Sequence, residues 1–318
     1  MNPAPPVVAV VGATATGKSG LGVALAHRLG GEVVSADASQ LYRGMDVGTA
    51  KLTLAEREGV PHHQLDVLDV VEEASLAAYQ REARADLEAV LGRGHVPLLV
   101  GGSGLYVRAA LDRLEIPPTD PEVRAALQAR ADAEGTPALY DELAALDPAA
   151  AAAIEPNNTR RVVRALEVVR LTGRPFSATM PTRELLRPTV VVGLRVPRDE
   201  LDARIARRTR AMFDAGLVEE VRGLVEHGLR EGRTASRAVG YAQALAVLDG
   251  TATLEEAVDD TALRTRRLVR RQESWFGADP RIRWLDATGP RLLDEALALV
   301  EQAQDARRRA GCDDGPHG

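Results

Sequence analysis

Cysteine and aromatic residues are scarce in this chain of 318 residues, which contains one cysteine, Cys312, and only 3% aromatic residues. A single cysteine excludes a disulfide framework and a cysteine-based zinc site, so any metal must be bound by oxygen or imidazole. No apolar run reaches the ~20 residues of a membrane span, and residues 1–6 lack the basic start of a signal peptide. We therefore expect a cytoplasmic protein that makes no contact with a membrane.

Lysine is also nearly absent, because it occurs only at positions 18 and 51 while all other cationic side chains are arginine. Where arginine has replaced lysine almost everywhere, Lys18 marks a place that needs a compact ammonium group. The net charge of −6 argues against a protein that coats nucleic acid. The length predicts about two domains with real cores, and nothing demands a partner chain, so we expect a monomer.

Short apolar runs alternate with helical patterns in the first third of the chain. Residues 7–11, 32–37 and 96–100 have the composition of buried strands, and residues 21–29 and 76–91 have helical periodicity. Strands that alternate with helices indicate an α/β fold, with a parallel sheet covered by helices on both faces.

The strand signals stop at about residue 116 and return at residues 190–194 and 281–285. The segment between them is rich in alanine, leucine and arginine, which predicts an inserted helical domain. We therefore predict a discontinuous catalytic core of residues 1–115 and 189–306, a helical insertion of residues 116–188, and a disordered tail of residues 307–318.

A phosphate-binding loop follows the first predicted strand and precedes a helix. It has the pattern G-x-x-x-x-G-K-[ST] and consists of Gly12, Ala13, Thr14, Ala15, Thr16, Gly17, Lys18 and Ser19. The glycines let backbone N–H groups surround a phosphate, while Lys18 and the Ser19 hydroxyl can reach phosphate and Mg²⁺. The loop predicts a diphosphate or triphosphate ligand and Mg²⁺ as cofactor.

The loop alone does not define the reaction. The strand at residues 97–100 runs into Gly-Gly-Ser-Gly rather than into an acidic Mg²⁺ ligand, and no guanine-reading motif is present. These absences disfavour a GTPase switch and leave a small-molecule kinase or another enzyme of diphosphate chemistry.

Asp37 ends the second predicted strand, so it should face the same crevice as Lys18, since ligands bind at the carboxyl ends of parallel strands. Its carboxylate can ligate Mg²⁺ or act as a general base, although a helix N-cap is the alternative. The amide of Gln40 can read an adenine edge, or it can simply be solvated.

Eight strings occur in the order found in bacterial tRNA dimethylallyltransferases, and the chain resembles that family from about Val7 to Trp284. They lie at residues 12–19 (GATATGKS), 37–42 (DASQLY), 45–51 (MDVGTAK), 61–66 (PHHQLD), 101–106 (GGSGLY), 161–167 (RVVRALE), 239–241 (VGY) and 271–276 (RQESWF). Each string is weakly specific, but the ordered set is highly specific.

The resemblance implies transfer of a dimethylallyl group from dimethylallyl diphosphate to N6 of adenine 37, in tRNAs that read codons beginning with U. We expect Asp37 to be the base and Lys18, the loop and Mg²⁺ at Ser19 to stabilise the leaving diphosphate. The family also implies diphosphate contacts for Ser103 and Arg237, although without the resemblance a glycine turn and a surface cation would explain them.

The expected partner is the anticodon stem-loop of tRNA, over which the helical insertion should close. The residues expected to bind it are Asp37, Ala38, Ser39, Gln40, Arg160, Arg161, Val162, Val163 and Arg164. Clustered arginines suit phosphate contacts, but solvated helix faces remain the alternative for any single arginine, including Arg204, Arg207 and Arg208.

The chain departs from the family pattern at a few positions, where it has Ala13 for proline, Ala38 for serine, Ser103 for threonine and Ala242 for a basic residue. Ala38 removes a polar group next to Asp37, while Ser103 keeps the hydroxyl of threonine. The competing hypotheses are a phosphate-loop kinase for a small metabolite, an isopentenyltransferase for free adenine nucleotides, and a nucleotide-dependent RNA-binding module without catalysis.

Two further clusters have structural rather than catalytic interpretations. His62 and His63 with Asp66 lack an obvious third metal ligand, so local packing is favoured over a zinc site. Trp275 and Phe276 end an amphipathic helix, where core packing is more common than base stacking.

Overall fold

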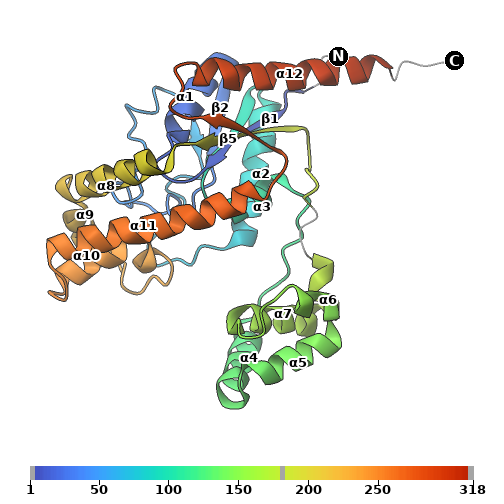
Figure 1. Cartoon of the computed structure of the whole chain (residues 1–318), viewed down its shortest axis with the longest axis vertical. Coiled ribbons are helices and arrows are strands. Elements are labelled where there is room, and N and C mark those ends of the chain that lie inside the picture. Colours follow the sequence, from blue (N-terminus) through green and yellow to red (C-terminus); the bar gives the residue numbers. More distant parts are fainter. Residues whose placement is uncertain (1–3, 180–182, 314–318) are drawn as a thin grey trace. The chain divides into compact units, whose positions relative to one another are not determined.

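A single parallel sheet organises the larger part of the chain (Figure 1). The computed structural model describes residues 4–179 and 183–313. Within them the strands are β1 (Val7–Gly12), β2 (Gly31–Ser35), β3 (His62–His63), β4 (Val96–Gly101), β5 (Thr189–Arg195) and β6 (Ile282–Asp286). Their order is β3-β2-β4-β1-β5-β6, and every neighbouring pair is parallel. The predicted α/β class is confirmed.

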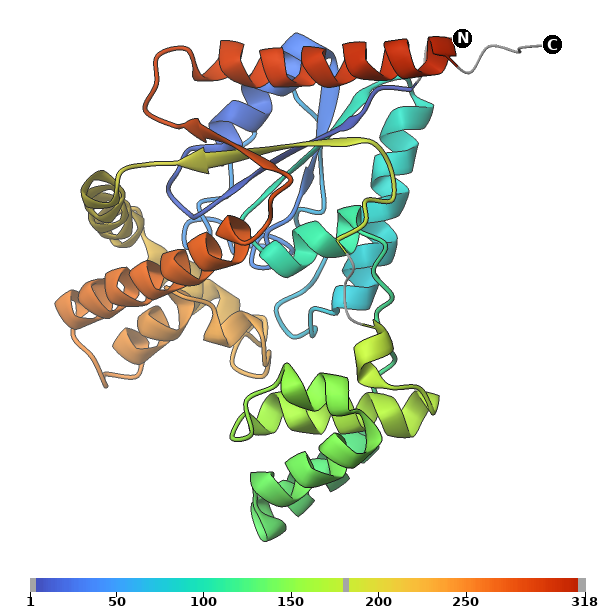
Figure 2. The same ribbon diagram turned by 45° about the vertical axis from the view of Figure 1, so that its right-hand side comes forward.

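Helices cover both faces of the sheet because its central strands have no polar face. Every residue of β1 and β4 is buried, as expected of parallel strands. The helices α1 (Lys18–Leu29) and α12 (Leu292–Asp313) pack against one face, where they share a core with Val8 and Val10. The helix α2 (Leu76–Gly92) packs against β2 and β4, and Figure 2 shows it beside the sheet together with α3 (Gly104–Leu111).

A group of helices follows β5 and builds a second core in the same unit. They are α8 (Arg198–Asp214), α9 (Leu217–Glu226), the short 3₁₀ helix η2 (Ala235–Arg237), α10 (Tyr241–Leu248) and α11 (Leu254–Gly277). Tyr42 and Met45, from the loop after β2, are buried among their apolar side chains. This packing ties the loop after β2 to helices that lie far along the sequence.

The chain divides into two compact units, residues 1–111 with 185–318 and residues 112–184. The sequence places these boundaries at 115/116 and 188/189. The smaller unit contains α4 (Pro121–Glu134), α5 (Thr136–Leu146), α6 (Pro148–Ala152), α7 (Thr159–Thr172) and the 3₁₀ helix η1 (Phe176–Thr179). Its core includes Leu127, Leu139, Leu143 and Leu166, which are all fully buried.

A buried carboxylate, that of Glu167, organises the start of the smaller unit. It accepts hydrogen bonds from Arg124, Arg164 and the backbone N–H of Asp120, at 2.8 to 3.2 Å. Burial favours a raised pKa for Glu167, but the hydrogen bonds outweigh burial and lower the pKa. The carboxylate therefore stays charged and joins α7 to the N-terminus of α4.

The end of the chain differs from the sequence expectation. Residues 307–313 continue α12 instead of forming a disordered tail, and Arg307 donates a hydrogen bond of 2.6 Å to the carbonyl oxygen of Ala4. The prediction failed because charged residues at the end of a helix resemble a solvated tail in sequence. Residues 314–318 lie outside the described residues.

The edge strand β3 is attached to the sheet through the buried carboxylate of Glu32. This carboxylate accepts hydrogen bonds from Arg93, His63 and His95 at 2.7 to 2.9 Å. The hydrogen bonds from Arg93 lower the pKa of Glu32 to about 2, against the opposing effect of burial and with help from both histidines. The carboxylate of Glu32 thus connects β2 to β3 and to the end of α2.

We expect Glu32→Gln to reduce the free energy of unfolding by about 2 kcal/mol at pH 7, because an amide leaves Arg93 without its ionic partner. A carboxyl group with a lowered pKa in the folded state stabilises above its unfolded pKa of 4.5, and this contribution is lost as the pH falls through about 2. Urea unfolding should therefore show a larger difference between variant and wild type at pH 7 than at pH 3. Glu82→Gln, at an exposed site on α2, serves as the control. An equal difference at both pH values would contradict this assignment.

Candidate active site

The loop of residues 12–19 connects β1 to α1 and forms a cradle for an anion. Gly12 and Gly17 have φ angles of 144° and 90°, and Ala15 also adopts a positive φ of 65°, a region that favours glycine. The Thr16 hydroxyl and the Lys18 ammonium donate hydrogen bonds to the carbonyl oxygen of Ala13, at 2.8 and 2.6 Å. The backbone amides of residues 15–19 have no acceptor among the described residues. A phosphate group would supply those acceptors.

Lys18 is held close to other charged groups at this loop. Burial lowers the pKa of Lys18 to about 8, Asp37 raises it in opposition, and Arg208 lowers it further. A bound anion would reverse this effect by favouring the ammonium form. The charge of Lys18 therefore depends on whether an anion is bound.

Asp37 lies just beyond the carboxyl end of β2 and lines the same cavity as the phosphate loop. One carboxylate oxygen, Oδ1, accepts a hydrogen bond of 3.0 Å from the backbone N–H of Ser39. The other oxygen has no protein donor within the described residues, so it is available to a ligand. The same Asx turn that orients the carboxylate also begins the segment of residues 38–40.

Ser103 joins the loops that follow β2 and β4. Its hydroxyl oxygen accepts a hydrogen bond of 3.1 Å from the backbone N–H of Ala38, and its own N–H donates to the carbonyl oxygen of Ala36 at 3.1 Å. This contact fixes the backbone beside Asp37, although the serine at position 38 of the family pattern is missing. Ser103 therefore also has a structural role in the loop, besides lining the cavity.

Gln272, on α11, bridges the phosphate loop and the glycine turn after β4. Its Oε1 accepts a hydrogen bond of 2.9 Å from the N–H of Thr14, and its Nε2 donates to the carbonyl oxygen of Gly102 at 2.9 Å. A Cβ atom on Gly102 would lie 2.6 Å from Nε2 of Gln272, so a larger residue here would displace the amide from this position. Gln272 belongs to the string of residues 271–276, but the sequence alone gives no role for this residue.

The sequence favours a solvated helix face for Arg208, on α8, but the structure places this arginine in the cavity wall. Its guanidinium donates to the Thr14 hydroxyl at 3.2 Å and to the carbonyl oxygen of Thr49 at 3.5 Å. Burial lowers the pKa of Arg208 and Asp37 raises it. The arginine is therefore a second, partly buried cation beside Lys18 at the phosphate loop.

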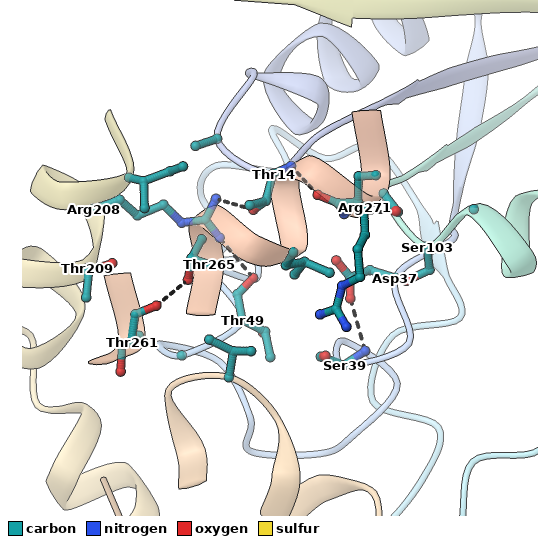
Figure 3. Close-up of a pocket in the computed structure, with 18 of the residues that line it drawn as sticks. Thr14, Asp37, Ser39, Thr49, Ser103, Arg208, Thr209, Thr261, Thr265 and Arg271 are labelled. Atoms are coloured by element: carbon teal, nitrogen blue, oxygen red, sulfur yellow. Dashed lines mark hydrogen bonds between the residues drawn. The ribbon is translucent and has the colours of Figure 1, made fainter. Parts of the chain in front are cut away.

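The cavity has a volume of about 350 Å³ and has two different sides. In Figure 3, Asp37, Ser103 and Arg271 lie on one side, and Arg208, Thr209, Thr261 and Thr265 lie on the other. Apolar side chains of α8 and α11, including Ile205, Met212 and Leu268, line it as well. The cavity can therefore accommodate a ligand that combines a charged diphosphate with a short apolar group.

Gln40 does not present a free amide to the cavity. Its Nε2 donates to the carbonyl oxygen of Thr49 at 3.3 Å, and its Oε1 accepts from the Ser35 hydroxyl at 3.3 Å. Both ends of the amide are thus oriented by the protein, and each retains capacity for one further hydrogen bond.

The predicted RNA-binding residues of α7 separate into two groups. Val162 and Val163 are 0% and 3% exposed, so their side chains face the core of the smaller unit, and the expectation that these residues bind RNA stays a prediction. Helical periodicity directs them inward, while Arg160 and Arg161 are exposed and have no ion pair among the described residues. Arg164 is bound to Glu167 and to the carbonyl oxygens of Pro117 and Pro118.

Two other predicted residues lie differently from expectation. Arg237 is exposed at the end of η2 and does not line the cavity, although Val239 does. Trp275 is 42% exposed and lines the cavity, whereas Phe276 is buried in agreement with core packing. A Cβ atom on Gly104 would lie 2.2 Å from the Trp275 indole, so glycine is required where α3 meets this side chain.

The oxygen groups at the phosphate loop fit a magnesium ion. The Ser19 hydroxyl has no hydrogen-bond partner among the described residues, and one oxygen of Asp37 is likewise open. Hydroxyl and carboxylate oxygens are ligands that Mg²⁺ prefers, usually together with phosphate oxygens and water. His62 and His63 belong to β3, where His63 bonds to Glu32, and no group of three metal-binding side chains occurs in the described part of the chain.

The order of the strands and the cradle after β1 define an α/β protein of the phosphate-loop class. Within that class, residues 40–279 match the family described as IPP transferase. The chain belongs to the IPP transferase family, and it is an enzyme. No helix in the described ranges is long and apolar enough to cross a membrane.

Similar proteins agree with this assignment. A tRNA dimethylallyltransferase of Kineococcus radiotolerans is 62% identical, with 94% of this chain and 97% of that protein covered. One from Streptomyces coelicolor is 58% identical over 94% and 97% of the two chains. These relatives favour the transferase hypothesis over the kinase alternative.

Solved structures show the same relationship. The tRNA isopentenylpyrophosphate transferase of Bacillus halodurans has a TM-score of 0.69 and 39% identity, with 95% of this chain and 99% of that chain covered. A eukaryotic dimethylallyltransferase described as acting on tRNA has a TM-score of 0.78 and 26% identity, and 98% and 80% of the chains are covered.

We expect binding of inorganic diphosphate with Mg²⁺ to weaken about tenfold between pH 7 and pH 9, because Lys18 loses its proton through a pKa of about 8 when no anion is bound. Titration calorimetry at several pH values measures the change. Lys18→Ala should bind more weakly at pH 7 and show a much smaller pH dependence. An unchanged slope in this variant would mean that another group causes the effect.

Proposed function

We propose that this protein is a tRNA dimethylallyltransferase. It transfers the dimethylallyl group of dimethylallyl diphosphate to N6 of adenine 37, in tRNAs that read codons beginning with U. The N6–carbon bond forms as the allylic carbon–oxygen bond breaks, and diphosphate leaves with the electron pair of that bond. The observation that carries the proposal is the open carboxylate of Asp37 in the cavity that contains the phosphate loop.

The leaving diphosphate is stabilised by groups that are already in position. Lys18, Arg208 and the amides of residues 15–19 supply positive charge and hydrogen bonds where negative charge develops. Mg²⁺ held through Ser19, with Asp37 nearby, would neutralise further charge on the phosphates. We assign Ser103 to the wall beside the diphosphate, whereas the phosphate contact of Arg237 rests on the resemblance to the family alone, since Arg237 does not line the cavity.

The nucleophile needs a base because the N6 lone pair of adenine is delocalised into the ring. Asp37 removes the N6 proton as the new bond forms. Its orientation is fixed by the N–H of Ser39, and the neighbouring backbone is fixed by Ser103. The missing serine at position 38 is therefore compensated by backbone hydrogen bonding.

The partner in this proposal is the anticodon stem-loop of tRNA, from which the adenine is flipped into the cavity. Residues 37–40 contact the base, and the exposed Arg160 and Arg161 contact RNA phosphates, which requires no sequence-specific hydrogen bonds. We propose that the protein acts as a monomer in the cytoplasm, where its tRNA substrate is found.

Labelled donors distinguish this activity from the kinase alternative. The protein and Mg²⁺ are incubated with an anticodon stem-loop containing A36 and A37, and with either labelled dimethylallyl diphosphate or γ-labelled ATP. We expect label from the prenyl donor in this RNA and none in a matched stem-loop with guanosine at position 37, which lacks the N6 amine. Label passing from ATP to a small acceptor, with no prenylated RNA, would overturn the proposal.

For the base, we expect Asp37→Asn to lower kcat by at least about a hundredfold, because an amide cannot accept the proton. Binding of dimethylallyl diphosphate should change less than about twofold, since the phosphate loop is intact. Single-turnover kinetics and calorimetry measure the two quantities. A variant with near-normal kcat would show that Asp37 is not the base.

A further inference from the structure

Residues 46–51, which we call the strap, belong to the loop after β2, and Gly48 and Thr49 of the strap line the cavity. The strap has no regular secondary structure beyond turns, so its conformation depends on contacts with other elements. The strap is held by Glu220, which Tyr241 supports, and by its own Lys51, which bonds to Asp66 and to Tyr42 outside the strap. None of these groups lines the cavity itself.

Glu220, on α9, binds three consecutive amides of the strap. Its Oε2 accepts hydrogen bonds from the N–H groups of Val47 and Asp46 at 2.7 and 3.2 Å, and its Oε1 accepts from Gly48 at 3.4 Å. Consecutive backbone amides that converge on one carboxylate form an anion-binding nest, and hydrogen bonds to an ionised acceptor are stronger than neutral ones.

Tyr241 closes the same contact from α10. Its hydroxyl donates a hydrogen bond of 2.5 Å to Oε1 of Glu220. Burial and the nearby Glu220 raise the pKa of Tyr241, so the hydroxyl remains a donor. A Cβ atom on Gly48 would lie 2.5 Å from the tyrosine ring, which explains why the strap has glycine at this position.

Lys51 fixes the other end of the strap. Its buried ammonium donates three hydrogen bonds, to Asp46 and Asp66 at 2.6 Å each and to the carbonyl oxygen of Tyr42 at 2.9 Å. All three N–H groups of the ammonium are therefore used. A guanidinium is larger and planar, which accounts for lysine rather than arginine at this position.

The contacts of Glu220 and Lys51 fix the backbone at Thr49, which lines the cavity. Figure 3 shows Thr49 between the two sides of the cavity. The carbonyl oxygen of Thr49 accepts hydrogen bonds from Nε2 of Gln40 and from Nη2 of Arg208. Thr49 is itself held by the hydrogen bond of its hydroxyl to the carbonyl oxygen of Met45, at 2.6 Å. A shift of the strap would thus move the carbonyl oxygen that Gln40 and Arg208 share as a hydrogen-bond acceptor.

We propose that Glu220 is a positioning residue, which orients Gln40 and Arg208 through the carbonyl oxygen of Thr49. The assignment rests on the proposed function for the role of Gln40, while the role of Arg208 concerns binding of diphosphate alone. Glu220 touches no substrate and acts only by holding the amides of the strap.

A double-mutant cycle tests this coupling. We expect Glu220→Gln to weaken binding of inorganic diphosphate with Mg²⁺ about fivefold and to raise the KM for the stem-loop about fivefold. In an Arg208→Ala background the first effect should fall below twofold, and in a Gln40→Ala background the second effect should do so. Fully additive effects would overturn the proposal, as would unchanged constants with a lower melting temperature.

Controls separate this result from a folding defect and from a wrong function. Glu219→Gln removes the neighbouring carboxylate, which pairs only with Arg222 at the surface among the described residues, and should leave both constants unchanged. If Glu220→Gln does not fold, Tyr241→Phe removes one hydrogen bond and carries the same cycle with smaller effects. A wild-type protein that prenylates no RNA would refute the proposed function, but the diphosphate measurements would still decide the coupling to Arg208.

Discussion

The amides of residues 15–19 follow a fully buried strand with five donors that have no acceptor among the described residues. Such donors are tolerated only where an anion or water satisfies them. Lys18 and Arg208 lie partly buried beside the same donors, and desolvation lowers the pKa of each. Two cations beside these amides repel one another, and a phosphate group in the cradle would turn the same features into favourable interactions. The surrounding hydrogen bonds of Gln272, Ser103 and Asp37 maintain this geometry between turnovers.

The pairing of arginines explains how an acidic chain can offer cationic surfaces. Many arginines of this protein are neutralised by carboxylates, as Arg124 and Arg164 are by Glu167 and Arg130 is by Glu142. Others have no ion pair in the described ranges, including Arg160, Arg161, Arg267, Arg270 and Arg271. The net charge of −6 averages over both groups, so it says little about the local potential.

Local patterns predicted the sheet and the cradle, because each depends on residues that are close in sequence. The apolar run before Gly12 identifies a buried strand, and the loop after it needs only glycines and Lys18 at fixed spacing. The contacts of Thr14 with Arg208 and Gln272 could not be predicted, since these side chains are 194 and 258 residues away. The string of residues 161–167 likewise does not show which of its side chains face solvent, whereas the helix directs the Val162 side chain into the core.

The position of β1 in the sheet has a consequence for synthesis of the chain. β1 is hydrogen-bonded to β4 on one side and to β5 on the other, and β5 is translated only after the whole helical insertion. Until residue 195 has left the ribosome, the most apolar strand of the protein has one unpaired edge, which is a site for aggregation. The insertion has its own core and can fold during this interval. Nesting one unit inside the other thus lengthens the period in which the nascent chain depends on protection of that edge.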